Sequence, residues 1–458
     1  MRFVSLFLFT LCLAAQPQPW IRVSSQTVAL THVRVVDGTG APERDNQTIL
    51  ISHGRIESIG NTGEVPIPNE AEVLDLPNYT VIPGLVGMHE HLVYPSFGAA
   101  VYTEHPFSFP RLYLASGVTT ARTAGGLEMQ TDLMVKKWID DGRYVGPDMH
   151  ITAGYLEGPG SFTPQMLELR DADDARAFVE YWAGRGATSF KAYMHITRAE
   201  LEAAITAAHA RHLKLTGHLC SVGFREAAAM SIDNLEHGIV VDSEFDPAKR
   251  PDQCPPSAGP PLATLDIASA PVQETIRELV QHHVAVTSTL AVFEVSPPLQ
   301  QRFLDALSSQ AALNYLQGRD RLPESSRKLS ALRIQRESEF ERAFVNAGGL
   351  LMAGADPTGN GSALAGFADQ RNIELLVAAG FSFAEAIRIA TLNGAKFLGL
   401  DDRIGSISAG KRADLAVIEG DPSSHIEDIE KVRIVFKNGV GYDSARLLES
   451  VRGMVGMH

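Results

Sequence analysis

Residues 81–91 read Val-Ile-Pro-Gly-Leu-Val-Gly-Met-His-Glu-His, an apolar run that ends in two histidines two positions apart. Side chains alternate along a β-strand, so His89 and His91 point to one side of such a strand and Glu90 points to the other. Imidazole is the commonest metal ligand in proteins, and two imidazoles at one strand end make half of a zinc site. The stretch therefore predicts a strand that ends at a metal, provided that other strands supply further ligands.

Strand-like and helix-like runs alternate between residues 83 and 399, as in chains built from βα units. The clearest helix follows a capping box from Thr197 to Glu200. Eight strand candidates end near His91, Arg122, Ala153, Tyr193, His218, His237, Thr289 and Asp356. Eight strands with helical returns predict an α/β protein with a closed (β/α)8 TIM-like barrel, whose chemistry lies at the carboxyl ends of the strands.

Short alternating runs, separated by turn residues, flank this segment on both sides. Two half-sheets from opposite ends of the chain can complete one small β-sandwich. We therefore expect a signal peptide at residues 1–18, the first part of the sandwich at 19–82, the barrel at 83–399, the second part of the sandwich at 400–445 and a C-terminal tail at 446–458.

The amino terminus has the layout of a secretory signal peptide: one arginine, an apolar run over residues 3–13, then two alanines. The run is too short to span a bilayer comfortably, so we expect export to the periplasm or the exterior without a stable membrane anchor. Cys220 and Cys254 then remain, and their pairing stays open. The net charge of −14 disfavours a nucleic-acid partner.

Other predicted strand ends carry residues that can complete a metal site. Lys191 lies inside an apolar strand, where an unpaired ammonium is costly to bury, so it needs a partner or a modification. His218 and His237 each end a short strand, and Asp356 follows the apolar run at 350–355. One such residue alone is more often structural, but together they would gather at one rim of a barrel.

Several motifs resemble those of the amidohydrolase superfamily, in the branch with two metals bridged by a carboxylated lysine. They are residues 83–91, Ser-Gly-Val-Thr-Thr at 116–120, Leu-Glu-His-Gly at 235–238, Ala-Gly-Ala-Asp at 353–356, Ala-Thr-Leu-Asn-Gly-Ala at 390–395, and the tail at 405–415. The chain is most similar to imidazolonepropionase-like and Xaa-Pro dipeptidase-like members.

The resemblance implies two divalent metal ions and a carbamate formed with carbon dioxide. One metal would be held by His89, His91 and Asp356, the other by His218 and His237, with carboxylated Lys191 bridging both. This ligand set suits zinc, while cobalt, manganese and nickel stay open. It further implies that a metal-bridging hydroxide attacks the substrate carbonyl, and that Asp356 is the catalytic residue that moves the proton to the leaving group.

We therefore expect an exported hydrolase that cleaves a carbon–nitrogen bond, in an amide or peptide, of a small molecule or a short peptide. A lactonase or esterase on the same site stays open, as does a homo-oligomer. Lys191 counts against a mononuclear deaminase, and the complete ligand set counts against a non-catalytic barrel.

Four further residues are candidates for contact with the substrate. Tyr155, Phe162 and Tyr193 lie near predicted strand ends, where they either line the pocket or pack within the barrel and its loops. Arg122 either meets an anionic substrate or pairs within the barrel.

Overall fold

A computed structural model describes residues 18–96 and 101–457 of the chain. The predicted signal peptide at residues 1–18 lies outside these described residues, apart from Gln18. In the described part of the chain, no helix combines the length and the apolar character that crossing a bilayer requires.

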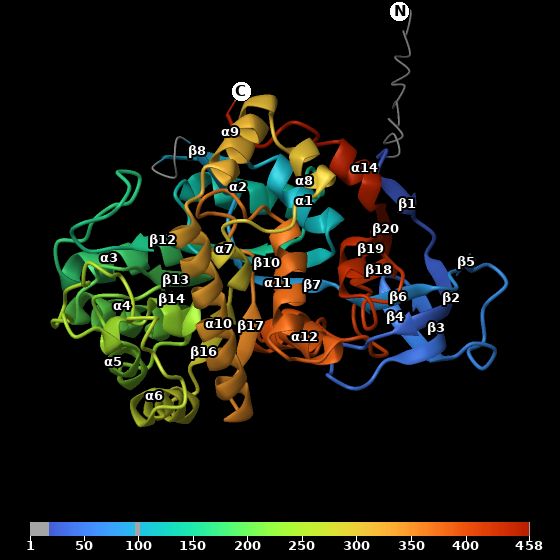
Figure 1. Cartoon of the computed structure of the whole chain (residues 1–458). Helices are drawn as coiled ribbons and strands as arrows, with labels where there is room; N and C mark the ends of the chain where they lie inside the picture. Colours follow the sequence, from blue (N-terminus) through green and yellow to red (C-terminus); the bar gives the residue numbers. More distant parts are fainter. Residues whose placement is uncertain (1–17, 97–100, 458) are drawn as a thin grey trace, which may run out of the picture.

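One nine-stranded sheet combines strands from both ends of the chain, as the sequence predicts (Figure 1). Its strands are β1 (Ile21–Val23), β2 (Thr27–Val35), β3 (Arg44–Ser52), β4 (Arg55–Asn61), β5 (Glu72–Asp75), β6 (Tyr79–Pro83), β18 (Leu415–Glu419), β19 (Val432–Lys437) and β20 (Val440–Asp443). β6 pairs with β18 and β1 pairs with β20, both antiparallel. Leu30 and Val81 share one buried core with Val417 and Phe436, so the two half-sheets are one folded unit.

The central part of the chain supplies the barrel. Its parallel strands are β7 (Leu85–Glu90), β10 (Val118–Thr123), β11 (Asp148–His150), β12 (Thr152–Leu156), β13 (Ser189–Ala192), β14 (Lys214–Gly217), β15 (Asn234–Glu236), β16 (Ala285–Ser288) and β17 (Leu351–Ala353). The ring closes where the amide of Asp356, just after β17, donates to the carbonyl of His89 in β7 at 2.8 Å. All eight predicted strands are therefore present.

The third predicted strand differs from the expectation. The sequence predicts that this strand ends near Ala153, but it is interrupted at Ile151 and continues to Leu156. The physical reason lies in its neighbours, because β11 pairs with β10 on one side whereas β12 pairs with β13 on the other. A short bridge between Gly126 and Gly154 spans the break.

Helices return the chain between these strands. The longer ones are α1 (Ser108–Ala115), α2 (Met129–Asp140), α3 (Ala172–Ala183), α4 (Arg198–Ala210), α6 (Ala270–Gln281), α9 (Ser309–Asp320), α10 (Glu324–Asn346) and α11 (Phe367–Ala378). The shorter ones are α5 (Phe224–Ala229), α7 (Leu290–Phe293), α8 (Gln301–Ala306), α12 (Phe383–Arg388), α13 (Gly394–Leu398) and α14 (Ser444–Glu449). The predicted capping box is confirmed: the Thr197 hydroxyl accepts from the Glu200 amide, and the Glu200 carboxylate accepts from the Thr197 amide.

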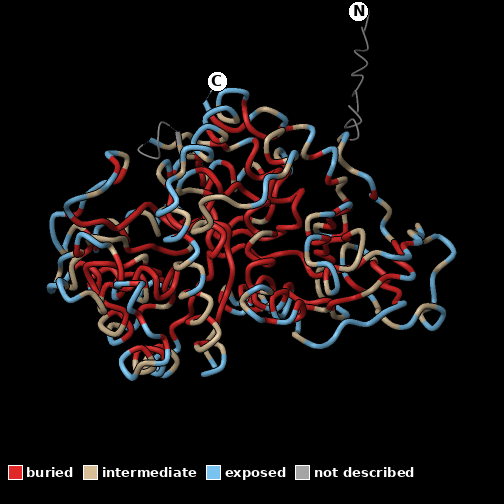
Figure 2. Tube along the Cα trace, viewed as in Figure 1, coloured by how far each residue is buried: buried red, intermediate tan, exposed pale blue. Residues whose placement is uncertain are grey.

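Buried segments run through the middle of the molecule, and exposed segments lie at its periphery (Figure 2). A hairpin of β8 (Val93–Ser96) and β9 (Val101–Glu104) follows the first barrel strand. Cys220 and Cys254 form a disulfide, with their Cα atoms 4.9 Å apart. The bond ties the proline-rich segment after β15 to the loop that follows β14, which settles the pairing that the sequence left open.

Candidate functional site

The residues predicted to hold metal meet at the carboxyl ends of the barrel strands. They line one cavity of about 250 Å³: His89, His91, Lys191, His218, His237 and Asp356. His89 lies near the end of β7, and His218 and His237 directly follow β14 and β15. Residues more than 260 positions apart in the sequence thus share one small volume, as a closed barrel requires.

His89, His91 and Asp356 form a candidate metal site. One carboxylate oxygen of Asp356 lies 3.4 Å from Nε2 of His91 and 3.7 Å from Nε2 of His89. One ligand atom from each of the three residues lies within 4.8 Å of the other two, and all three residues are buried. Nitrogen and carboxylate oxygen donors in this arrangement fit a divalent ion such as zinc.

The outward nitrogens of the ligand histidines are already engaged. Nδ1 of His89 lies 2.9 Å from the Glu236 carboxylate, and Nδ1 of His91 lies 3.0 Å from the carbonyl of Gly125. Both partners can only accept a hydrogen bond, so Nδ1 carries the proton in each neutral ring. Nε2 of each ring therefore keeps its lone pair for a metal.

Burial also sets the protonation of these rings. It lowers the pKa of His89 to about 4, with a further contribution from the nearby Lys191 charge. Burial is likewise the largest cause that holds the pKa of His218 and of His237 well below the ordinary value of 6.5. The three imidazoles are therefore neutral at neutral pH, which is the form that binds metals.

Lys191 lies among the histidines rather than beside an acid. It is buried, and its Nζ is 3.1 Å from Nε2 of His89. The rings of Tyr155 and Tyr193 lie 5.5 and 5.7 Å from Nζ. Within the described ranges, no carboxylate comes within ion-pair distance of this ammonium, and burial lowers the pKa of Lys191 to about 8.

Two of the predicted metal ligands have unusual backbone conformations. His237 and Asp356 adopt φ values of +69° and +45°, in the left-handed region that non-glycine residues rarely occupy. Such residues cost about 1–3 kcal/mol each and cluster at functional sites. His237 directly follows β15, Asp356 lies three residues after the end of β17, and both line the cavity.

Arg122 lies inside the barrel instead of the cavity. Its guanidinium donates to the Glu236 carboxylate at 2.6 Å and to the carbonyl of Met88 at 2.8 Å, and its side chain is 1% exposed. The sequence left two roles open for Arg122, and the structure shows the second one, an ion pair within the barrel. Glu236 therefore bridges Arg122 and His89, a link that the sequence does not predict because Arg122 and Glu236 lie 114 positions apart.

The three aromatic candidates line the cavity. The rings of Tyr155 and Tyr193 are 4.8 Å apart between centroids, and Phe162 is 6.1 Å from Tyr193. The ring of Tyr193 also lies 4.9 Å from the ring of His218, so the aromatic wall adjoins the predicted metal ligands. Local sequence pattern does not indicate the other wall residues, which are Val93 in β8, Tyr102 in β9, Leu127, Met166, Val292 and Phe293 in α7, Arg333 in α10, Thr358 and Gly359.

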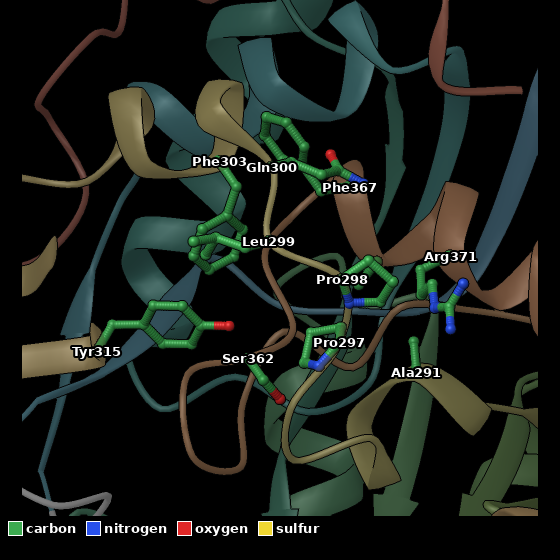
Figure 3. Close-up of a pocket in the computed structure, with 11 residues that line it drawn as sticks. Ala291, Pro297, Pro298, Leu299, Gln300, Phe303, Tyr315, Ser362, Phe367 and Arg371 are labelled. Carbon is green, nitrogen blue, oxygen red and sulfur yellow. The ribbon is translucent and has the colours of Figure 1, made fainter. Parts of the chain in front are cut away.

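A second hollow lies between the loop at 297–300 and helices α9 and α11 (Figure 3). The hydroxyl of Tyr315 points into it, and Arg371 lies at its edge with its guanidinium paired to Glu294 and Glu374. It encloses only about 30 Å³, roughly the volume of one water molecule. That hollow is too small for a substrate, whereas the cavity at the strand ends encloses about 250 Å³ and is lined by the predicted metal ligands.

A barrel with a buried His-His-Asp cluster at its carboxyl face defines a metal-dependent hydrolase. The family model described as "Amidohydrolase family" matches residues 80–440. The chain belongs to this family: it is an amidohydrolase, a hydrolase that acts on carbon–nitrogen bonds, and its fold is the family's TIM barrel with a β-sandwich.

Solved structures agree with this fold over nearly the whole chain. A protein assigned as a prolidase, from Bifidobacterium longum, is 25% identical, with a TM-score of 0.68 over 93% of this chain and 99% of that one. A Xaa-Pro dipeptidase with bound methionine is 20% identical, with a TM-score of 0.68 over 91% and 100%. Molinate hydrolase is 16% identical, with a TM-score of 0.67 over 95% and 99%.

Among curated proteins, the imidazolonepropionase of Micrococcus luteus is 49% identical over 45 residues. That match spans 10% of this chain and 11% of the relative, so it shows a shared segment and not a shared activity.

Proposed function

We propose that this chain is an exported hydrolase with two divalent metal ions, which cleaves an amide or peptide bond in a small molecule or short peptide. The carrying observation is the position of Lys191, whose Nζ lies 3.1 Å from His89 Nε2 in the cavity that also holds His218 and His237. A lysine at this place, without an acidic partner among the described residues, fits a bridging carbamate between two ligand groups.

Carboxylation removes the physical conflict at Lys191. The amine adds to carbon dioxide and releases a proton, so a buried cation becomes an anion with two oxygen ligands. His89, His91 and Asp356 would then hold one ion, and His218 and His237 the other. Within this site, a mononuclear deaminase would leave Lys191 buried and unpaired, which is costly.

When bound, the two ions would lower the pKa of water and polarise the substrate carbonyl. The residues of the chain supply the rest. Asp356, whose carboxylate is held by the Thr358 hydroxyl at 2.8 Å, is placed to take a proton from water and pass it to the leaving nitrogen. Tyr155 and Tyr193 exclude water from one side of the cavity.

Two observations support the finer parts of the proposal. Several structural neighbours are named as prolidases or dipeptidases, which supports an amide or peptide as the substrate class. The disulfide between Cys220 and Cys254 supports export, because such bonds persist in oxidising compartments.

The test is the metal content per chain, measured on protein purified without chelator, for the parent and for Lys191→Ala. We expect about two metals in the parent, a sharp fall in the variant together with loss of hydrolysis of an amide panel, and carbamate signal from labelled bicarbonate in the parent only. Lys214→Ala, in the neighbouring strand but partly exposed, is the matched control and should keep its metals. One metal in the parent, with Lys191→Ala still loaded and active, would overturn the dinuclear proposal; an ester or lactone preference in the panel would redirect the substrate class.

A further inference from the structure

Arg333, on helix α10, lines the same cavity as the metal-site residues. The charged side chains of the wall, apart from the histidines, are Lys191, Asp356 and Arg333. Lys191 and Asp356 lie against the histidines and are occupied there. Arg333 comes from a different wall, where α10 packs against α7, and is the remaining charge available to a ligand.

Arg333 differs from the arginines around it in having no partner. Arg336, one turn further along α10, pairs with Glu339 at 2.7 Å, and Arg371 pairs with Glu294 and Glu374. Across the part of the chain that the structure describes, the Arg333 guanidinium takes part in no hydrogen bond, ion pair or ring contact. Burial alone lowers its pKa, and no acidic neighbour raises it again.

An unpaired guanidinium in a half-buried wall is a costly feature unless an anion completes it. The planar fork of arginine matches a carboxylate with two parallel hydrogen bonds. The surfaces beside it are apolar, with Phe293 and Val292 on α7 and the tyrosine pair across the cavity. A ligand that fits this wall therefore has an anionic end and an apolar body.

We propose that Arg333 binds a carboxylate of the substrate, so that the enzyme acts on small amides or peptides with a free carboxylate near the scissile bond. This inference rests on the proposed function, and it names the substrate class of the same site. The cavity of about 250 Å³ lies just below the range typical of sites for drug-sized ligands, which limits the substrate to about the size of an acylated amino acid.

The first test compares kcat/KM for N-acetylphenylalanine and for its uncharged methylamide, in metal-loaded protein. We expect the parent to prefer the carboxylate, and Arg333→Met to lower kcat/KM for it by about 10- to 100-fold while changing the methylamide by less than about twofold. Arg333→Lys should recover part of the preference, because it restores the charge without the fork. Arg336→Gln is the matched control and should behave as the parent.

An unchanged preference in Arg333→Met, with both substrates still cleaved, would overturn this inference and leave the proposed hydrolase standing. If no form of the protein cleaves an amide, the proposed function fails. A binding measurement with a ligand that cannot be hydrolysed then tests the role of Arg333 separately. The probe for this measurement is phenylacetate, and uncharged phenylethanol is its control. Neither compound contains a bond that the enzyme could hydrolyse. A Kd for phenylacetate at least about tenfold weaker in Arg333→Met supports the carboxylate site, and equal values overturn it, since the carboxylate then binds elsewhere, for example at the metals.

Discussion

Replacing Glu236 by glutamine should weaken metal binding without removing any ligand. In the parent, one carboxylate oxygen of Glu236 accepts from Arg122 at 2.6 Å and the other faces Nδ1 of His89 at 2.9 Å. Glutamine has a single acceptor oxygen. The buried, charged guanidinium of Arg122 donates a stronger hydrogen bond to this oxygen than the neutral ring of His89 does. The amide NH2 then faces His89 and donates to Nδ1, which moves the ring proton to Nε2 and blocks the metal-binding nitrogen.

The expected size follows from the burial of the network. Loss of the partner that fixes a ligand histidine costs about 10- to 100-fold in metal affinity, or about 1.4–2.8 kcal/mol. Leaving Arg122 with a neutral partner adds a loss of folding stability of about 3 kcal/mol, because Arg122 and Glu236 are 1% and 0% exposed.

Metal affinity measured by competition with a chelator of known affinity provides the assay. Arg122→Met combined with Glu236→Gln frees the amide to turn its oxygen towards His89, so affinity should largely return although stability does not. Glu341→Gln, another buried glutamate, is the matched control and should bind metal as the parent does. Two results would refute this reasoning: a metal affinity of Glu236→Gln equal to that of the parent, or no recovery of metal affinity in the double variant. Either result would show that Arg122 and His89 do not compete for the single acceptor oxygen of glutamine.

Two further predictions concern stability. Burial raises the pKa of Glu341 from 4.5 to about 8, so the folded chain keeps a proton that the unfolded chain releases, and stability should fall between these pH values by at most about 1.4 kcal/mol per unit. Relative to the parent, Glu341→Gln should therefore gain more free energy of unfolding in urea at about pH 8 than at about pH 5. Equal gains at the two pH values would contradict the raised pKa of Glu341. The Cys220→Ser, Cys254→Ser variant loses a crosslink across 34 residues and should unfold with about 4 kcal/mol less free energy; a urea midpoint that matches the oxidised parent would argue against this estimate.

The parts of the fold that depend on local pattern could be predicted from the sequence. Alternation placed His89 and His91 on one side of a strand, and both line the cavity. The capping box at Thr197 fixed the start of a helix because its two hydrogen bonds are local. The strand ends carrying Lys191 and His237 followed from short apolar runs, and the barrel then brings them together.

The parts of the fold and site that depend on tertiary packing could not be predicted from the sequence. Arg333 is one of several arginines on α10, and which of them faces the cavity depends on how that helix rotates against α7. The role of Glu236 depends on Arg122, 114 positions away. The break in the third strand arises from its two different neighbours, which the strand's own residues do not encode.

The sheet shared by the two ends of the chain has a consequence for biosynthesis. Strand β6 leads directly into the first barrel strand, but its partner β18 begins only at Leu415. Likewise, the partner of β1 is β20, which begins only at Val440. Until the ribosome has made that last segment, β6 presents an open edge and part of the shared core is missing. The finished fold must therefore form after nearly all of the chain has been made, and a chain truncated before Leu415 should aggregate rather than fold.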